Sequence, residues 1–148
     1  MNAFLSNHIL HVALITGLIA QFLKVPVYYL RKKKWNFDLL FSNGGFPSSH
    51  TAIVTALMTR IGRDIGMDSP LFAISFVFGV IVIFDATGVR QEVGRHSKTL
   101  NDIVEMFKLR EWFKFELLEE LVGHTVAEVL GGLILGFGLA FLSYLWLP

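Results

Sequence analysis

The sequence predicts an all-α polytopic membrane bundle of about four membrane helices plus an amphipathic helix at the membrane interface. Of its 148 residues, 53% are hydrophobic and only 17% are charged, whereas about 25% are charged in soluble domains. The mean hydropathy is +0.57. Long apolar stretches also alternate with short basic segments. The length suits a single membrane-embedded domain covering residues 1–148.

Three apolar stretches are the clearest candidates for membrane spans. Phe4 to Leu23 is nearly continuous in apolar residues, and basic residues follow it rather than precede it. This order is typical of a retained anchor and not of a cleaved secretory signal. Pro70 to Thr87 and Thr125 to Leu147 are the other two. Each approaches the ~20 residues that cross a ~30 Å hydrocarbon core.

The stretch from Ser48 to about Ile65 is a weaker candidate. Its apolar part is short, and Arg60, Arg63 and Asp64 lie near its end. Long arginine side chains can reach from the membrane interior to the interface. Two alternatives follow: this segment spans the membrane with its arginines extended, or it is a helix buried among the others.

The basic residues favour one membrane face. Segment 24–34 carries five of them and segment 90–114 carries six, whereas the connection between the second and third helices has only Arg60 and Arg63. By the positive-inside rule, the two basic segments face the cytoplasm and both termini face outward. We therefore expect a protein of a bacterial-type cytoplasmic membrane with its polar site on the cytoplasmic face.

Two further segments lie between the third and fourth spans. Apolar residues recur at helical spacing from Ile103 to Leu121, with charged residues between them, which is typical of an amphipathic helix at a membrane surface. Gly88 to Asn101 is polar and is expected to form a loop that carries a solvated His96. His8 and His11 are expected at the opposite membrane face.

The first candidate motif is Phe46-Pro47-Ser48-Ser49-His50, preceded by Gly44 and Gly45. Ser and Pro suit the start of a helix, and glycine lets the backbone approach a ligand closely. Unpaired N–H groups at a helix N-terminus suit phosphate, and His50 could donate a proton beside it. A plain capped helix with an interfacial histidine is the alternative.

The second motif is Gly123-His124-Thr125-Val126-Ala127-Glu128. Residues i and i+4 share a helix face, so Glu128 can hold the His124 ring and leave its other nitrogen free to attack phosphorus. A carboxylate this close to lipid is costly unless it is paired. A structural His–Glu pair that holds helices together is the alternative.

Several cations could complete an anion site. Lys24, Arg31 and Arg90 are candidate phosphate ligands, Arg90 with Asp85 to orient it. The alternatives are charges that anchor a helix end at lipid headgroups and, for Arg90, a helix-terminal salt bridge. Lys32, Lys33 and Lys34 are assigned to headgroups outright. Gly132 and Gly136 form a G-x-x-x-G that indicates a packing seam.

Composition excludes some chemistry. The chain has no cysteine, which excludes disulfides, thiolate metal ligands and a cysteine nucleophile. The net charge of +1 gives no indication of nucleic-acid binding, and we expect none.

Together the motifs resemble those of the type 2 phosphatidic acid phosphatase and vanadium haloperoxidase superfamily, K-x6-R-P, P-S-G-H and S-R-x5-H-x3-D. Lys24 and Arg31 match the first in spacing, with Lys32 in place of Pro. Pro47-Ser48-Ser49-His50 matches the second with Ser for Gly. His124 and Glu128 match the end of the third with Glu for Asp. The small size, the Gly-Gly-Phe-Pro-Ser-Ser-His-Thr-Ala string and Gly-His-Thr-x-x-Glu-Val resemble the divergent branch called acid phosphatase/vanadium-dependent haloperoxidase-related.

The resemblance implies a membrane phosphatase that hydrolyses a lipid or polyprenyl phosphate monoester or diphosphate. His124 would form a phosphohistidine while Glu128 holds its ring, and His50 would protonate the leaving group. Lys24, Arg31, Arg90 and the amides near Ser48 and Ser49 would stabilise the phosphoryl oxygens. Gly45 and Asp85 would support the site. No metal or cofactor is implied, vanadate should inhibit, and a homo-oligomer could form through the last helix.

The third motif departs from the family pattern. The positions that should hold Ser-Arg are Leu117 and Leu118. Arg90 is the expected substitute, with Arg110 and Lys114 behind it. If none of these cations reaches the site, the chain is a membrane binding or structural protein that keeps the scaffold without catalysis. A soluble haloperoxidase-like enzyme is disfavoured by the composition.

Overall fold

The computed structural model describes residues 6–107, 117–118 and 123–146 of the chain. Every regular element in these ranges is a helix, which confirms the predicted all-α class. The α-helices and the two 3-10 turns are α1 (His8–Lys32), η1 (Phe37–Leu40), α2 (Ser49–Asp64), α3 (Pro70–Thr87), α4 (Val89–Met106), α6 (Val126–Leu142) and η2 (Ser143–Leu145).

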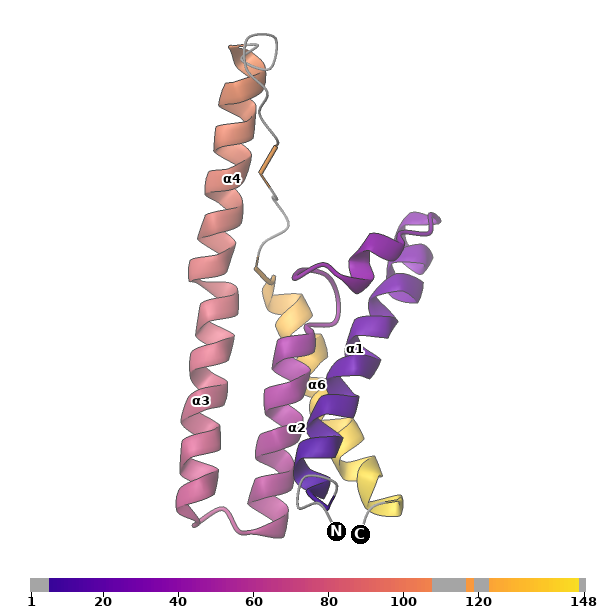
Figure 1. The fold of residues 1–148 in the computed structure, drawn as a ribbon, viewed down its shortest axis with the longest axis vertical. Helices are drawn as coiled ribbons and strands as arrows, with labels where there is room; N and C mark the ends of the chain where they lie inside the picture. Colours follow the sequence, from indigo (N-terminus) through magenta and orange to yellow (C-terminus); the bar gives the residue numbers. More distant parts are fainter. Residues whose placement is uncertain (1–5, 108–116, 119–122, 147–148) are drawn as a thin grey trace.

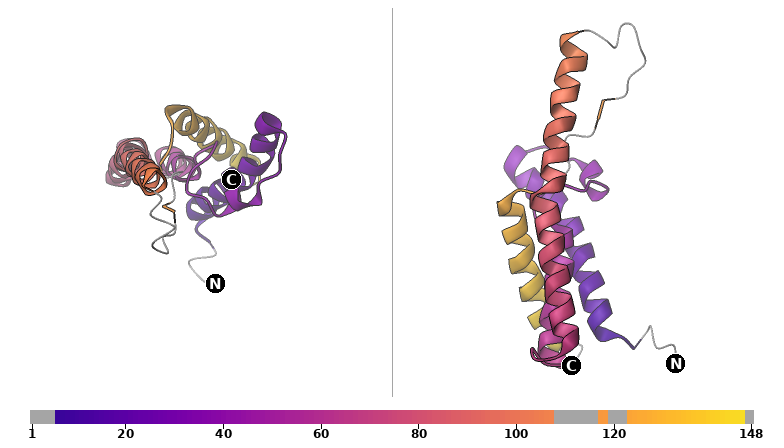
Figure 2. Two further views of the ribbon diagram at one scale, coloured as in Figure 1. Left: turned by 90° about the horizontal axis from the view of Figure 1, so that it is seen from above. Right: turned by 90° about the vertical axis from the view of Figure 1, so that its left-hand side faces the viewer.

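Helix α2 is the centre of the bundle. It packs against α1, α3 and α6, and these three helices surround it when the molecule is seen along its length (Figure 2). Helix α4 continues in nearly the direction of α3 and projects past the end of the bundle (Figure 1). The two termini lie at the other end of the bundle (Figure 1). The bundle therefore has one end with the termini and one end from which α4 extends.

Three stretches are long and apolar enough to cross a membrane: His8–Lys32, Pro70–Met106 and Val126–Leu145. The α3 part of the second stretch leaves most of its apolar side chains uncovered, with Ile74 66% and Phe84 72% exposed. Uncovered apolar side chains along a helix suit contact with lipid. The fold is that of an integral membrane protein.

The structure favours the second of the two alternatives for α2. Its 16 residues give a length of about 24 Å, and it runs from the end of the bundle near the start of α6 to the turn before α3 at the other end (Figure 1). Its Arg60 does not extend to an interface: it is 2% exposed and pairs with Asp64 at 2.9 Å. Helix α2 is therefore a buried helix enclosed by the membrane spans.

The G-x-x-x-G of the last helix is a packing seam, and its partner is α2. A Cβ added at Gly132 would lie 2.6 Å from the Ser48 carbonyl oxygen, and one at Gly136 would lie 2.6 Å from that of Ala52. Only glycine allows the two backbones to come this close. Because α2 occupies this seam, a homo-oligomer through the last helix would have to use another of its faces.

Helix ends differ from the prediction at two places. Helix α1 continues through the basic segment as far as Lys32, even though Pro26 lies inside it. Helix α6 ends at Leu142 and a 3-10 turn follows. Helix α3 spans the predicted residues, from a Ser69 cap with proline in its first turn.

The predicted loop from Gly88 to Asn101 is wrong, because Val89–Met106 is helix α4. Its polar residues form an exposed helix face rather than a loop, with an i,i+3 ion pair between Glu92 and Arg95 at 2.5 Å. The predicted amphipathic helix from Ile103 therefore begins within α4. Leu117 and Leu118 are not helical, and residues 108–116 and 119–122 lie outside the described ranges.

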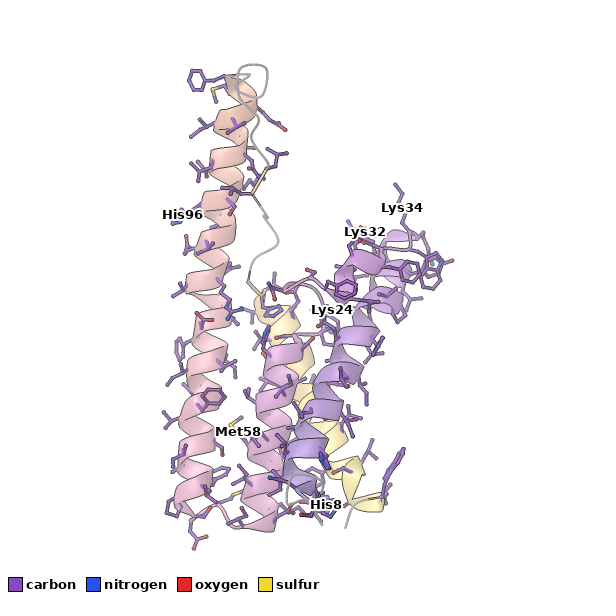
Figure 3. All side chains as sticks on the ribbon, viewed as in Figure 1. His8, Lys24, Lys32, Lys34, Met58 and His96 are labelled. Atoms are coloured by element: carbon purple, nitrogen blue, oxygen red, sulfur yellow. The ribbon has the colours of Figure 1, made fainter. Side chains whose placement is uncertain are left out.

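The remaining histidines lie away from the centre of the bundle. His8 sits at the end that holds the termini, as expected, and His96 lies on α4 beyond the bundle (Figure 3). His96 is exposed, although on a helix rather than a loop.

Candidate active site

Two helix N-termini meet at the end of the bundle from which α4 projects. Helix α2 follows the cap residue Ser48, whose backbone N–H donates to the Glu128 carbonyl oxygen at 3.0 Å. Helix α6 follows Thr125, which forms a capping box with Glu128. The two motifs, far apart in sequence, are thus joined by a backbone hydrogen bond.

His124 lies at the start of α6 and is 2% exposed. Its backbone N–H donates to the Ala86 carbonyl at the end of α3 at 2.9 Å. Its ring Nδ1 lies 3.1 Å from Glu128 Oε2, as the i,i+4 spacing predicts. With Nδ1–H donating to the carboxylate, Nε2 carries the lone pair of a neutral imidazole. Nε2 is buried and has no hydrogen-bond partner among the described residues.

His50 lies in the first turn of α2 and faces the same place. Its ring centroid is 6.0 Å from that of His124, and the rings are tilted by 56°. Titratable side chains from three other elements lie near enough to the His50 ring to influence its charge, among them Lys24, Asp85 and Arg90. The fold therefore brings both imidazoles and both motifs to one site.

Lys24 supplies a buried cation from α1. It is 2% exposed and donates to the Ser42 carbonyl oxygen at 3.0 Å. Figure 3 places it near the end of the bundle where α2 begins. Its stem runs beside Gly45, and its charge interacts with that of Glu128. A lysine buried this deeply needs such partners.

The hydroxyl groups of Ser48 and Ser49 already have partners in the protein. The Ser48 hydroxyl accepts hydrogen bonds from the Thr51 backbone N–H at 3.3 Å and the Thr51 hydroxyl at 2.9 Å. The Ser49 hydroxyl donates to Gln21 Oε1 at 2.5 Å. Gln21 Nε2 in turn donates to carbonyl oxygens at Leu39, Leu40 and Ser42. These serines thus fix the cap and the loop around the site, a network that sequence reasoning did not find.

The two candidate arginines lie farther out. The Arg31 guanidinium lies over the Phe46 ring, 4.8 Å from its centroid, and Arg31 is exposed. Arg90 Nε lies 2.6 Å from Asp85 Oδ2, with both side chains more than 40% exposed. The predicted Asp85–Arg90 pair is therefore present. Arg110 and Lys114, the other predicted substitutes, lie outside the described residues.

A cavity of about 320 Å³ opens between α4, the start of α6 and the loop before α2. His124, Glu128 and Gly45 line it, as does the exposed face of α4. Gly44, Gly123 and Thr125 of the two predicted motifs also line it. Sequence reasoning missed the rest of the lining, which comes from α4: Gln91, Gly94, Arg95 and Lys98. The α4 set has i, i+3, i+4, i+7 spacing, a helix signal that the loop assignment concealed.

An all-α bundle that places two imidazoles and a buried lysine at one end of its membrane spans defines a polytopic membrane protein with a polar site. Comparison with known proteins gives its family. The chain belongs to the Divergent PAP2 family, whose pattern matches residues 5–139. It is also similar to the "Uncharacterized membrane protein YuiD" of Bacillus subtilis (strain 168), with 40% identity over 143 aligned positions, 89% of this chain and 90% of that protein. No solved structure matches it significantly.

Proposed function

We propose that this protein is a membrane phosphatase that hydrolyses a lipid or polyprenyl phosphate, as a monoester or diphosphate, through a phosphohistidine on His124. One observation carries the proposal: the His124 ring is held by Glu128 through Nδ1, while its Nε2 has no described partner beside His50. A histidine whose second nitrogen is unpartnered beside a cavity suits a nucleophile.

In the first step Nε2 of His124 attacks phosphorus and a P–N bond forms as the P–O bond to the leaving group breaks. His50 donates the proton that the departing oxygen needs. Glu128 stabilises the positive charge that develops on the His124 ring. In the second step water attacks the phosphohistidine and gives a proton to His50, which restores the acid for the next cycle. The P–N bond breaks, inorganic phosphate leaves and His124 returns to its neutral state. Because Nε2 is shielded here, substrate binding must displace a neighbouring group before attack.

Positive charge and backbone amides stabilise the phosphoryl oxygens. Lys24 is the buried cation of the site, and Arg90 is close enough to act on His50. Arg31 is the outermost of the proposed ligands. Cations arranged before the reaction begins stabilise a transition state without reorganisation.

Other residues hold the phosphate ligands in position, and the membrane spans and basic segments bear on where the site lies. Asp85 orients Arg90, while Ser48 and Ser49 fix the α2 N-terminus, whose partial positive charge supports anion binding. Gly45, at φ +99°, lets the loop pass close to Lys24. A site at one end of the membrane spans would lie at the level of lipid headgroups, which supports a lipid phosphate as the substrate. The basic segments beside it indicate the cytoplasmic face.

A phosphate-release screen over lipid and polyprenyl phosphates in detergent tests this proposal. The wild-type protein should release phosphate, orthovanadate should inhibit it, and His50→Ala and His124→Ala should each lose most of the activity. Turnover that His124→Ala leaves unchanged would refute the mechanism.

A binding protein without catalysis is the second candidate. Two observations favour it: Nε2 of His124 has almost no exposed surface, and leucines occupy the Ser-Arg positions of the third motif. Orthovanadate that raises the melting temperature of a protein inactive on every phosphate tested would support this alternative.

A further inference from the structure

The face of α4 that lines the cavity carries two positive charges that the mechanism above does not use. Arg95 and Lys98 lie one turn apart on this helix and line the same cavity as His124 and Glu128. Helical spacing places Gln91 and Gly94 on the same face. Both cations are exposed, so they can reorient without losing a packed environment.

The start of α4 is docked closely against the turn before His124. A Cβ on Gly123 would lie 2.5 Å from the Gln91 backbone nitrogen and 2.7 Å from the Arg90 carbonyl carbon. Gly123 also has φ +95°, a conformation that other residues rarely adopt. This backbone contact fixes the distance between the α4 face and the nucleophile.

A second contact ties α4 to the segment that lacks the motif arginine. The Asn101 side chain accepts from the Leu118 backbone N–H at 2.9 Å and donates to the Leu118 carbonyl oxygen at 2.9 Å. Leu118 occupies the position at which the third motif places its arginine. Helix α4 therefore lies against the segment from which that cation is absent.

The partners of the candidate cations differ. Arg90 points its Nε at Asp85 and does not line the cavity. Arg95 pairs with Glu92, with the two side chains 65% and 52% exposed, and such exposed pairs contribute little and exchange readily with an incoming anion. The cavity's own carboxylate, Glu128, already accepts hydrogen bonds from the His124 ring and the Thr125 N–H.

From these contacts we infer that Arg95 and Lys98 bind the phosphate group in the cavity and replace the positive charge missing from the third motif. This inference rests on the proposed function only for the reaction. Anion binding by these two cations does not require that the protein be catalytic. Arg95 supplies a forked guanidinium that suits two phosphate oxygens, and Lys98 supplies a point charge one turn away.

Orthovanadate titration of the full-length protein in detergent tests the inference, followed by tryptophan fluorescence or melting temperature. Arg95→Gln and Lys98→Gln should each weaken vanadate binding about tenfold, and the double variant by more, because each loses a charge-assisted hydrogen bond. Arg95→Lys should recover part of the loss.

Two variants serve as controls. Lys34→Gln removes the same charge from an exposed residue outside the cavity and should leave vanadate binding unchanged. Glu92→Gln breaks the same ion pair but keeps Arg95, so it should leave vanadate binding unchanged or tighten it. If Glu92→Gln weakened vanadate binding as much as Arg95→Gln, both substitutions would be acting by disturbing α4 rather than by removing an anion ligand. That result would overturn the inference.

The inference and the proposed function fail in different ways. Wild-type binding that Arg95→Gln and Lys98→Gln leave intact, or a wild-type protein that binds no vanadate, overturns the anion site. Vanadate binding that depends on both residues in a protein with no phosphate release supports the anion site and refutes the phosphatase. If the protein releases phosphate and neither Arg95→Gln nor Lys98→Gln changes KM, the phosphatase is supported and the anion site is refuted.

Discussion

His124 and Glu128 form the smallest unit of the site. The i,i+4 spacing at the start of α6 makes Glu128 both the partner of the ring and the last member of a capping box. A buried nitrogen without a partner costs about 1–3 kcal/mol, and Nε2 is such an atom among the described residues. Unsatisfied polar atoms of this kind are expected where a ligand completes the structure.

Substitution of Glu128 separates its two roles. Glu128→Gln keeps a residue that can close the capping box but removes the carboxylate charge that stabilises the imidazolium. We expect kcat to fall about 10²- to 10⁴-fold with the melting temperature little changed. Glu128→Ala should lose both activity and stability. Full activity in folded Glu128→Gln, measured by phosphate release, would contradict this role.

The role of His50 as a general acid predicts a dependence on the leaving group. An alkyl phosphate needs a proton at its departing oxygen, whereas a nitrophenyl phosphate does not. His50→Ala should therefore lose about 10²-fold or more on the alkyl substrate and much less on the aryl one. His124→Ala should lose activity on both. Equal losses for His50→Ala on the two substrates would argue against proton donation.

Among the helices, the ends could be predicted from the sequence where capping residues and the apolar pattern agree. Helix α3 has a Ser69 cap, proline in its first turn and an uninterrupted apolar run, so its ends could be predicted. Helix α4 has no side-chain cap, because Gly88 precedes it, and its composition is polar. Its cavity-lining residues do recur at helical spacing, but the polar composition favoured a loop and this signal was overlooked. Missing α4 meant missing Arg95 and Lys98.

The contact between α2 and α6 gives a prediction for stability. Gly136→Ala would place a methyl group 2.6 Å from the Ala52 carbonyl oxygen, so we expect a loss of about 1–3 kcal/mol in the free energy of unfolding. Gly138→Ala is a matched control on the same helix, because a Cβ there has no atom of the described chain within 4 Å. It should be neutral or stabilising by up to about 1 kcal/mol. Unfolding in detergent measures both.

At the scale of the molecule, the charge distribution identified the polar end. Lys24, Lys32, Lys34 and His96 lie toward the end of the bundle from which α4 projects, opposite His8 and the termini (Figure 3). The meeting of His50 with His124 follows from the packing of α2 against α6, and the motif resemblance predicted it. The cavity wall could not be predicted, since it depends on how α4 leaves the bundle.

Cysteine labelling tests the placement in the membrane, and the chain has no cysteine of its own to interfere. Asp68, between α2 and α3, and Thr99, on α4, are both exposed and lie toward opposite ends of the molecule. In intact cells an impermeant maleimide should label Asp68→Cys, whereas Thr99→Cys should react only after permeabilisation. The reverse pattern would place the site on the outer face.

Rapid alkaline quenching during turnover of a lipid phosphate, followed by peptide mapping, shows whether His124 carries the phosphoryl group. Alkali preserves a phosphohistidine, so the phosphoryl group should be found on the peptide that contains His124 and should be absent from His124→Ala. A phosphoryl group on another residue, or undiminished turnover by His124→Ala, would contradict the account.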